Sequence, residues 1–225
     1  MRPIRSLTIA AAAIALCLTA VACGASGAGG ASPPAPPGTH QASASGPATP
    51  NPTKSKESPV PVESPVPVES NPPGDIPDST QFVPYRSAAG GFEIRAPEGW
   101  SRRTTSSSVT FTSKLNSISV SWRQTSMQPT AAAVKSSEVP QLQRTFRAFQ
   151  LVSVKKVTLP VGDAVQVDLH ANSEPNGVTG KQYRLDVLRF DFFRNGREAS
   201  LDLSSPVGSD NVDAWKLISE SFGWQ

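Results

Sequence analysis

The stretch that decides the fold is GGFEIRAPEGW, residues 90–100. Within it, three apolar side chains alternate with two charged ones, in the order Phe92, Glu93, Ile94, Arg95 and Ala96. This period of two predicts a strand with one buried face and one exposed face. Pro97 and Gly99 follow at the positions that a type I turn prefers, so we expect the strand to end there.

Downstream of this turn, the pattern predicts two further strands and then a helix. SVTFTS (108–113) and SISVSW (117–122) alternate in the same way as the first strand. The apolar residues then recur at steps of three and four, which is typical of an amphipathic helix. Ser137 is the expected N-cap of this helix, and Pro140 would fall in its first turn. The apolar stripe consists of Val139, Leu142, Phe146 and Phe149.

The last third of the chain predicts two hairpins and a second helix. Residues 151–159 would pair with 164–170, and residues 181–193 with 197–203. Asn195-Gly196 joins the second pair, and this dipeptide favours a type I′ turn because both residues tolerate a positive φ. The final helix is expected to begin at Ser209 or Asp210. Its buried stripe would consist of Val212, Trp215, Ile218 and Phe222.

The order of three strands, helix, four strands and helix predicts an α+β domain. We expect one antiparallel sheet of about six to seven strands, packed with two amphipathic helices. Residues 90–100 resemble the opening motif of PsbP/Mog1-like domains, a Gly-Phe strand followed by Pro-x-Gly-Trp. The ending LDLSSPVGSDNVDAWKLISESFGW (201–224) resembles the close of actinobacterial lipoproteins of the LpqN type. The resemblance implies a PsbP/Mog1-like fold over 81–225, and its motifs carry no catalytic residue.

Residues 24–80 have a different composition from the rest of the chain. They are rich in proline and small residues, and every Phe, Trp and Tyr of the protein lies at position 82 or later. Such a segment buries too little apolar surface to offset its ordering entropy, which predicts disorder. The tandem repeat ESPVPVESPVPVES (57–70) favours the extended polyproline form of a semi-rigid spacer. We therefore expect a tether up to residue 80.

The N-terminus has the pattern of a secretory signal. Arg2 and Arg5 precede an uncharged, mostly apolar run over residues 7–22, which is shorter than a membrane span needs. The run ends in Ala20-Val21-Ala22-Cys23, which resembles the bacterial lipobox. The resemblance implies that residues 1–22 are removed and that Cys23 carries the lipid that anchors the protein. Ordinary cleavage after Ala22, which would leave a free thiol, is the alternative.

Few residues of the domain suit catalysis or metal binding. His170 is the single histidine beyond the tether, and a Ser-His-Asp hydrolase would need it as its base. None of the serines lies in a Gly-x-Ser-x-Gly motif. Asp168 and His170 share one strand face and could bind a metal together with Asp163 or Glu174, but one histidine and scattered carboxylates are a thin ligand set. We expect neither an enzyme nor a metal site nor a cofactor.

One strand is apolar on both faces. In LRFDFFR (188–194) one face carries Leu188, Phe190 and Phe192, while Phe193 points to the other. Either helices cover both faces, or one face is an apolar surface that binds a ligand. The candidate binding surface therefore consists of Leu188, Phe190, Phe192 and Phe193. Four tryptophans could line a groove as well, but aromatic residues at regular strand and helix positions are usually core: Trp100, Trp122, Trp215 and Trp224.

The charge of the chain argues against nucleic-acid binding, and the expected location indicates a role in the cell envelope. The formal net charge of +3 is modest, and its basic residues are not clustered as nucleic-acid binding requires. We expect an exported monomer on the outer face of the cell membrane, with a non-catalytic binding or assembly domain. Its partners would be the membrane, through the lipid anchor, and an envelope protein or lipid. The alternative is a carrier or sensor of an apolar small molecule or lipid, and a His170-dependent hydrolase is the least favoured reading.

Overall fold

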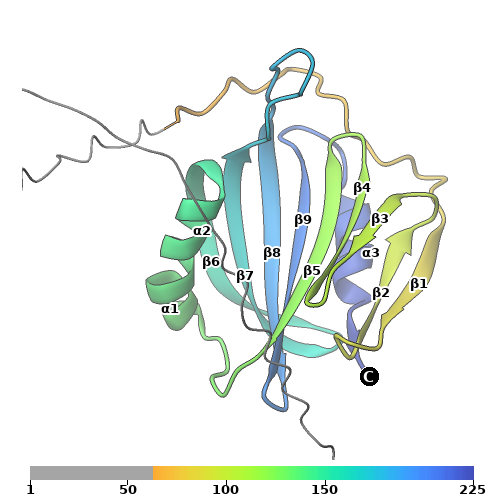
Figure 1. Ribbon diagram of the computed structural model, residues 1–225, viewed down its shortest axis with the longest axis vertical. Coiled ribbons are helices and arrows are strands. Elements are labelled where there is room, and N and C mark those ends of the chain that lie inside the picture. Colours follow the sequence, from red (N-terminus) through yellow and green to blue (C-terminus); the bar gives the residue numbers. More distant parts are fainter. Residues whose placement is uncertain (1–62) are drawn as a thin grey trace, which may run out of the picture. The chain divides into compact units, whose positions relative to one another are not determined.

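The computed structural model describes residues 63–225, shown in Figure 1. The expected signal sequence, the lipid attachment at Cys23 and the tether up to residue 62 lie outside these residues. Within residues 63–225 no helix is both long enough and apolar enough to cross a membrane.

Two antiparallel sheets form the body of the domain. The larger sheet has seven strands in the order β3-β4-β5-β9-β8-β7-β6, and the smaller has the order β1-β2-β10. The strands of the larger sheet are β3 (Ser101–Thr104), β4 (Ser108–Ser113), β5 (Asn116–Gln124), β6 (Arg147–Leu159), β7 (Gly162–Asn172), β8 (Arg184–Arg194) and β9 (Arg197–Pro206). Those of the smaller sheet are β1 (Phe82–Ser87), β2 (Phe92–Pro97) and β10 (Gly223–Trp224).

Helices lie on both faces of the larger sheet (Figure 1). One face is covered by a continuous helical segment of α1 (Ala131–Ala133), η1 (Val134–Glu138) and α2 (Val139–Thr145). The smaller sheet and α3 (Val212–Glu220) lie on the other face. The larger core fills this second side, where apolar residues of β2, β4, β5, β8, β9 and α3 pack together. A smaller core lies between the helical segment and strands β6 to β8.

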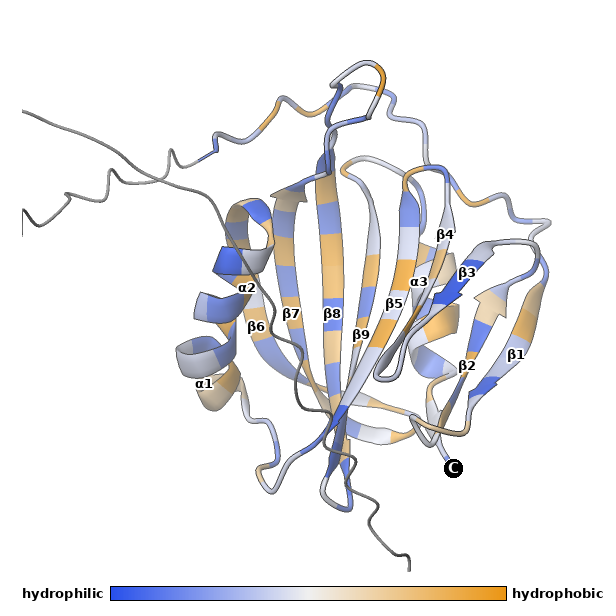
Figure 2. Ribbon diagram, in the orientation of Figure 1, coloured by the Kyte–Doolittle hydropathy of each residue, from blue (hydrophilic) through white to orange (hydrophobic). Residues whose placement is uncertain are grey.

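The α+β class expected from the sequence is confirmed, and so is the hairpin at Asn195-Gly196. Both residues have a positive φ, 50° and 76°, as a type I′ turn requires. Three strands were not expected, namely β1, β3 and β10. Strands β1 and β10 pair with β2 to form the separate smaller sheet, and β3 is an edge strand of the larger one. The orange and blue bands that alternate along β7 and β8 in Figure 2 show the period of two that predicts strands.

The first predicted helix differs from the observed one at both ends. Thr130 is its N-cap, accepting a hydrogen bond from the backbone N–H of Ala133, so the predicted cap at Ser137 is wrong. A π-turn occupies Val134–Glu138 and ends two residues before Pro140. Proline lacks an N–H and clashes with the carbonyl four residues earlier, which explains a widened turn at this point. The helix ends at Thr145, so Phe149 packs on the smaller core from β6 rather than from the helix.

The C-terminal helix also begins later than predicted, with Asn211 rather than Ser209 or Asp210 at its N-cap position. Trp215 and Ile218 are buried as expected. Val212 is 72% exposed, so its place in the predicted stripe is wrong. Phe222 is buried but follows the end of the helix, where it stacks on Phe192 with ring centroids 4.0 Å apart.

Residues 63–80 do not form the disordered tether that the composition predicts. Ile76 is buried in the larger core, and its N–H donates to the Asn211 side chain at 2.7 Å. Glu63 forms an ion pair with Arg147 at 2.8 Å, and it accepts a hydrogen bond from Asn172 at 2.9 Å. Side chains of the folded domain thus satisfy polar groups of a segment that has little apolar surface of its own. The domain extends at least to residue 63.

Candidate functional site

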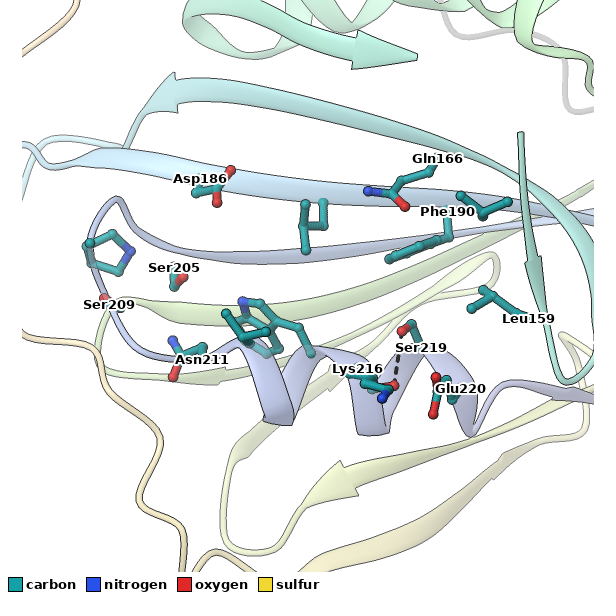
Figure 3. A pocket seen from close by; sticks show the side chains of 16 residues that line it. Leu159, Gln166, Asp186, Phe190, Ser205, Ser209, Asn211, Lys216, Ser219 and Glu220 are labelled. Atoms are coloured by element: carbon teal, nitrogen blue, oxygen red, sulfur yellow. Dashed lines mark hydrogen bonds between the residues drawn. The ribbon is translucent and has the colours of Figure 1, made fainter. Parts of the chain in front are cut away.

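A cleft lies between α3 and the neighbouring strands β6, β7 and β8 of the larger sheet (Figure 3). Its volume is about 420 Å³, within the range of about 300–1,000 Å³ that small-molecule sites occupy. The helix and the smaller sheet cover part of this sheet face, and the cleft opens where that cover ends. It is the first candidate site of the domain.

Apolar side chains from both walls form the inside of the cleft. Leu188 and Phe190 of β8 alternate onto this face because residues two apart on a strand point the same way. Val157 and Leu159 of β6 continue the same surface. Trp215 closes the opposite side from α3, where it is 6% exposed. A ligand in the cleft would therefore contact hydrocarbon and aromatic surface from the sheet and the helix alike.

Polar groups frame this apolar interior. Figure 3 shows Asp186 and Gln166 on the sheet side, and Lys216 and Glu220 on the α3 side. Burial raises the pKa of Asp186, while the nearby His170 opposes that shift. His170 Nε2 lies 3.7 Å from Asp186 Oδ1. An apolar interior with few polar groups at its border is the usual composition of a site for an amphipathic small molecule.

The four residues of the predicted apolar surface do not form one surface. Leu188 and Phe190 line the cleft. Phe192 is 1% exposed and stacks on Phe222 in the core. Phe193 lies on the opposite sheet face, where it lines a separate cavity of about 360 Å³ next to the start of α1. The structure thus brings together only two of the four residues.

The two faces of β8, the strand that is apolar on both sides, are covered differently. On one face of β8, Val187 is buried in the smaller core and Leu185 packs against it, so the helical segment covers this side. On the other face, Phe192 is covered, but Leu188 remains half-buried beside the cleft. Leu185 and Val187 therefore belong to the smaller core, and the other face of the strand changes from core to cleft wall along its length.

The histidine and carboxylates considered for metal binding or hydrolysis are dispersed. Asp168 accepts hydrogen bonds from Ser153 and from Gln166. Asp163 forms an ion pair with Lys156 at 2.7 Å, and Glu174 lies 3.6 Å from Arg147. Within residues 63–225, no serine hydroxyl hydrogen-bonds to His170. These residues do not assemble into the geometry of a catalytic triad or of a metal site.

The four tryptophans mostly belong to the core. Trp100, Trp122 and Trp224 are partly buried and pack against the larger core, and Trp215 is a member of it. Trp215 is the tryptophan that also borders the cleft. Its dual position follows from the 3.6-residue period of α3, which turns one stripe toward the sheet.

The polar border of the cleft was not identified from the sequence. Asp186, Lys216 and Glu220 lie on three different turns or strands, and nothing in their sequence context distinguishes them from other surface charges. Asn211 was also missed, although it is 2% exposed and bonds to Ile76 and Gly74 beside the cleft. An asparagine directly after the two predicted cap residues, Ser209 and Asp210, would have been the available signal.

No protein family and no curated protein sequence matches the chain. Solved structures that resemble it include the PsbP protein CyanoP of Synechocystis, with 16% identity and a TM-score of 0.49 over 69% of this chain and 100% of that one. The Ran-binding protein Mog1p of Saccharomyces cerevisiae has 9% identity and a TM-score of 0.44 over 65% of this chain and 96% of that one. LpqN of Mycobacterium tuberculosis, described as involved in cell envelope biogenesis, has 16% identity and a TM-score of 0.41, with 65% and 91% covered.

The fold and the cleft together define the class of this protein. It is an α+β domain with two antiparallel sheets. Its cleft offers an apolar interior with a charged border and no assembled catalytic group among the residues described above.

Proposed function

We propose that the protein is an exported, lipid-anchored binding protein whose domain holds an amphipathic small molecule or lipid in the α3 cleft. The cleft carries this proposal, because it combines about 420 Å³ of space with apolar walls from β6, β8 and α3. Binding without chemistry fits a site in which charged groups lie at the border rather than around a reacting atom. The proposed role is therefore that of a carrier or sensor, and we favour it over assembly with an envelope protein.

The anchoring part of the proposal rests on the sequence. Cys23 follows a charged n-region and an apolar run, and it stands directly after Ala20-Val21-Ala22. Two or three acyl chains at this position would hold the protein stably at the membrane, at about 0.8 kcal/mol for each buried methylene. A domain held at the outer face of the membrane would meet lipids and other amphipathic molecules of the envelope.

A binding titration with a charge placed in the cleft tests the ligand class. The probe is cis-parinaric acid, a fluorescent fatty acid, added to the full chain. Leu188→Glu should weaken binding of the fatty acid at least tenfold, because the hydrocarbon tail of the bound probe would remove water from the new carboxylate. Leu188 is half-buried, and a thermal melt of the variant verifies that it still folds.

Leu217→Glu is the matched control for this substitution. Leu217 lies on α3, is 38% exposed and is not among the residues that line the cleft. The control should bind the probe as the unsubstituted chain does. If both variants weaken binding equally, or if the unsubstituted chain does not bind the probe, the cleft is not a site for apolar chains.

A further inference from the structure

A group of charged side chains lies on the opposite face of the larger sheet, under the helical segment. Strands β8 and β9 turn alternate residues to this face, and the π-turn η1 supplies one more residue above them. The group differs from its surroundings, since the smaller core beside it is built from aliphatic side chains. Its acidic members are Glu138 from η1, Asp191 from β8, and Glu198 and Asp202 from β9.

Two arginines contact these acids but do not balance them. Arg189 donates to Asp202 through Nη1 at 3.1 Å, and its Nη2 reaches Glu138 Oε1. Arg123 donates to Glu198 Oε1 at 2.7 Å, although its side chain is 60% exposed. Four carboxylates thus face two guanidinium groups, one of which lies largely in solvent. Uncompensated negative charge in a buried place is costly unless a cation neutralises it.

Asp191 has a buried carboxylate oxygen that lacks a hydrogen-bond partner among the described residues. It is fully buried, and its Oδ1 accepts hydrogen bonds from Arg189 Nε at 3.1 Å and from Ser200 Oγ at 2.7 Å. Its Oδ2 is also buried and has no hydrogen-bond partner among residues 63–225. A buried acceptor without a partner costs about 1–3 kcal/mol, and more when it is charged.

One carboxylate oxygen from each of Glu138, Asp191 and Glu198 lies within 4.8 Å of the others. Oxygens on opposite sides of a calcium ion are separated by about twice the metal–oxygen distance of 2.3–2.6 Å. Magnesium demands shorter bonds of about 2.0–2.1 Å in near-ideal octahedral geometry, which two strands and a helix turn do not impose. We propose that Glu138, Asp191 and Glu198 form a calcium-binding site.

The local structure supports this arrangement in two ways. The widened π-turn before Pro140 ends at Glu138, and π-turns inside α-helices are frequent at functional sites. Each arginine engages only Oε1 of its glutamate, which leaves both Oε2 atoms available to a metal.

Room for the remaining ligands exists beside the three carboxylates. Calcium takes six to eight oxygens, and water would supply those that the protein does not. A cavity of about 210 Å³ borders Glu138 and Glu198, and one of about 250 Å³ borders Glu198 and Ser200. A third cavity is lined by Asp191 together with Lys156 and Asp163. These spaces provide both water positions and a route from solvent to the site.

Isothermal titration calorimetry of the full chain, first treated with EDTA and desalted, tests the proposal with calcium chloride. We expect saturable binding of one ion per chain, with a dissociation constant on the order of 10⁻⁴ M, as in extracellular calcium modules. Asp191→Asn keeps the size of the side chain and removes its charge, so affinity should fall at least tenfold. Magnesium chloride should bind more weakly than calcium chloride.

Asp213→Asn is the control, because Asp213 is an exposed carboxylate on α3, which covers the other face of the larger sheet and borders none of these three cavities. It should bind calcium as the unsubstituted chain does. If Asp191→Asn does not fold, Glu138→Gln on the helical segment gives the same test. The proposal is wrong if the unsubstituted chain shows no saturable calcium binding at millimolar concentrations. It is equally wrong if Asp191→Asn or Glu138→Gln binds as tightly as the control, which would mean that the buried carboxylates hold a proton instead.

Discussion

Replacing Trp215 with alanine separates a core role from a surface role for α3. Trp215 is 6% exposed, belongs to the larger core, and at the same time borders the cleft. If the helix is held by this side chain, Trp215→Ala removes packing between α3 and the sheet. If α3 only rests on the surface and offers Trp215 to a partner, Trp215→Ala should leave the melting temperature nearly unchanged.

The size of the effect follows from burial. Truncating a buried tryptophan costs about 3–5 kcal/mol, as lost transfer free energy and as the cavity left behind. We expect the lower end, about 3 kcal/mol, because one side of the indole already borders open space. For a protein of this size, about 1 kcal/mol shifts the melting temperature by roughly 2–4 °C, so the expected decrease is roughly 6–12 °C.

The assay is a thermal melt of the full chain followed by circular dichroism, with Val212→Ala as the matched control. Val212 lies on the same helix and is 72% exposed, so its truncation should change stability by no more than about 0.5 kcal/mol. Equal melting temperatures for the two variants would refute the reasoning, since they would show that Trp215 contributes no more packing than an exposed valine.

Three further predictions concern the anchor, the domain boundary and the buried aspartate. Cys23→Ala should release the protein from the membrane fraction and leave its precursor unprocessed; a variant that stays membrane-bound would place the anchor elsewhere. Limited proteolysis should leave a stable fragment that begins near residue 63, whereas a fragment that begins near residue 80 would contradict the observed contacts of Glu63 and Ile76. In EDTA, stability should fall as pH rises through about 7, because folding raises the pKa of Asp191 from 3.8 and the folded state then binds more protons. Denaturant titrations at several pH values should show this slope in the unsubstituted chain and a smaller one in Asp191→Asn.

The sequence predicted most of the larger sheet because its strands have one buried face. Residues of β5 and β7 alternate between apolar and polar, which gives a period of two without reference to distant contacts. Strand β3 escaped prediction because all of its residues are exposed, so the sequence SRRT has no apolar member to reveal the period. The two residues of β10 are too few to form any pattern.

The error at the first helix has a specific physical origin. Phe146 and Phe149 continue the helical spacing of Val139 and Leu142, yet both lie beyond the last helical residue. They pack on the same core as the helix because the chain reverses into β6 beside it. Apolar spacing alone cannot separate a helix from a helix followed by a strand that covers the same core.

The two candidate sites differ in how far the sequence could reveal them. Leu188 and Phe190 were found because a strand with apolar residues on both faces is unusual. The partners that make the cleft, such as Trp215 and Lys216, come from a different part of the chain and are joined to it only by tertiary packing. Asp191 had a visible signal, since it is an acid between Phe190 and Phe192 in an apolar strand, but its orphaned oxygen required the structure.

The measurement that tests the central claim most directly is mass spectrometry of lipids that co-purify with the protein from its native membrane. Extraction with organic solvent, without cleavage of covalent bonds, leaves any acyl chains on Cys23 attached to the protein and collects only the bound ligand. The account predicts an amphipathic molecule in stoichiometric amount with the unsubstituted chain and with Leu217→Glu, and its loss from Leu188→Glu. An extract without such a molecule, or one that Leu188→Glu retains in full, would contradict binding in the α3 cleft.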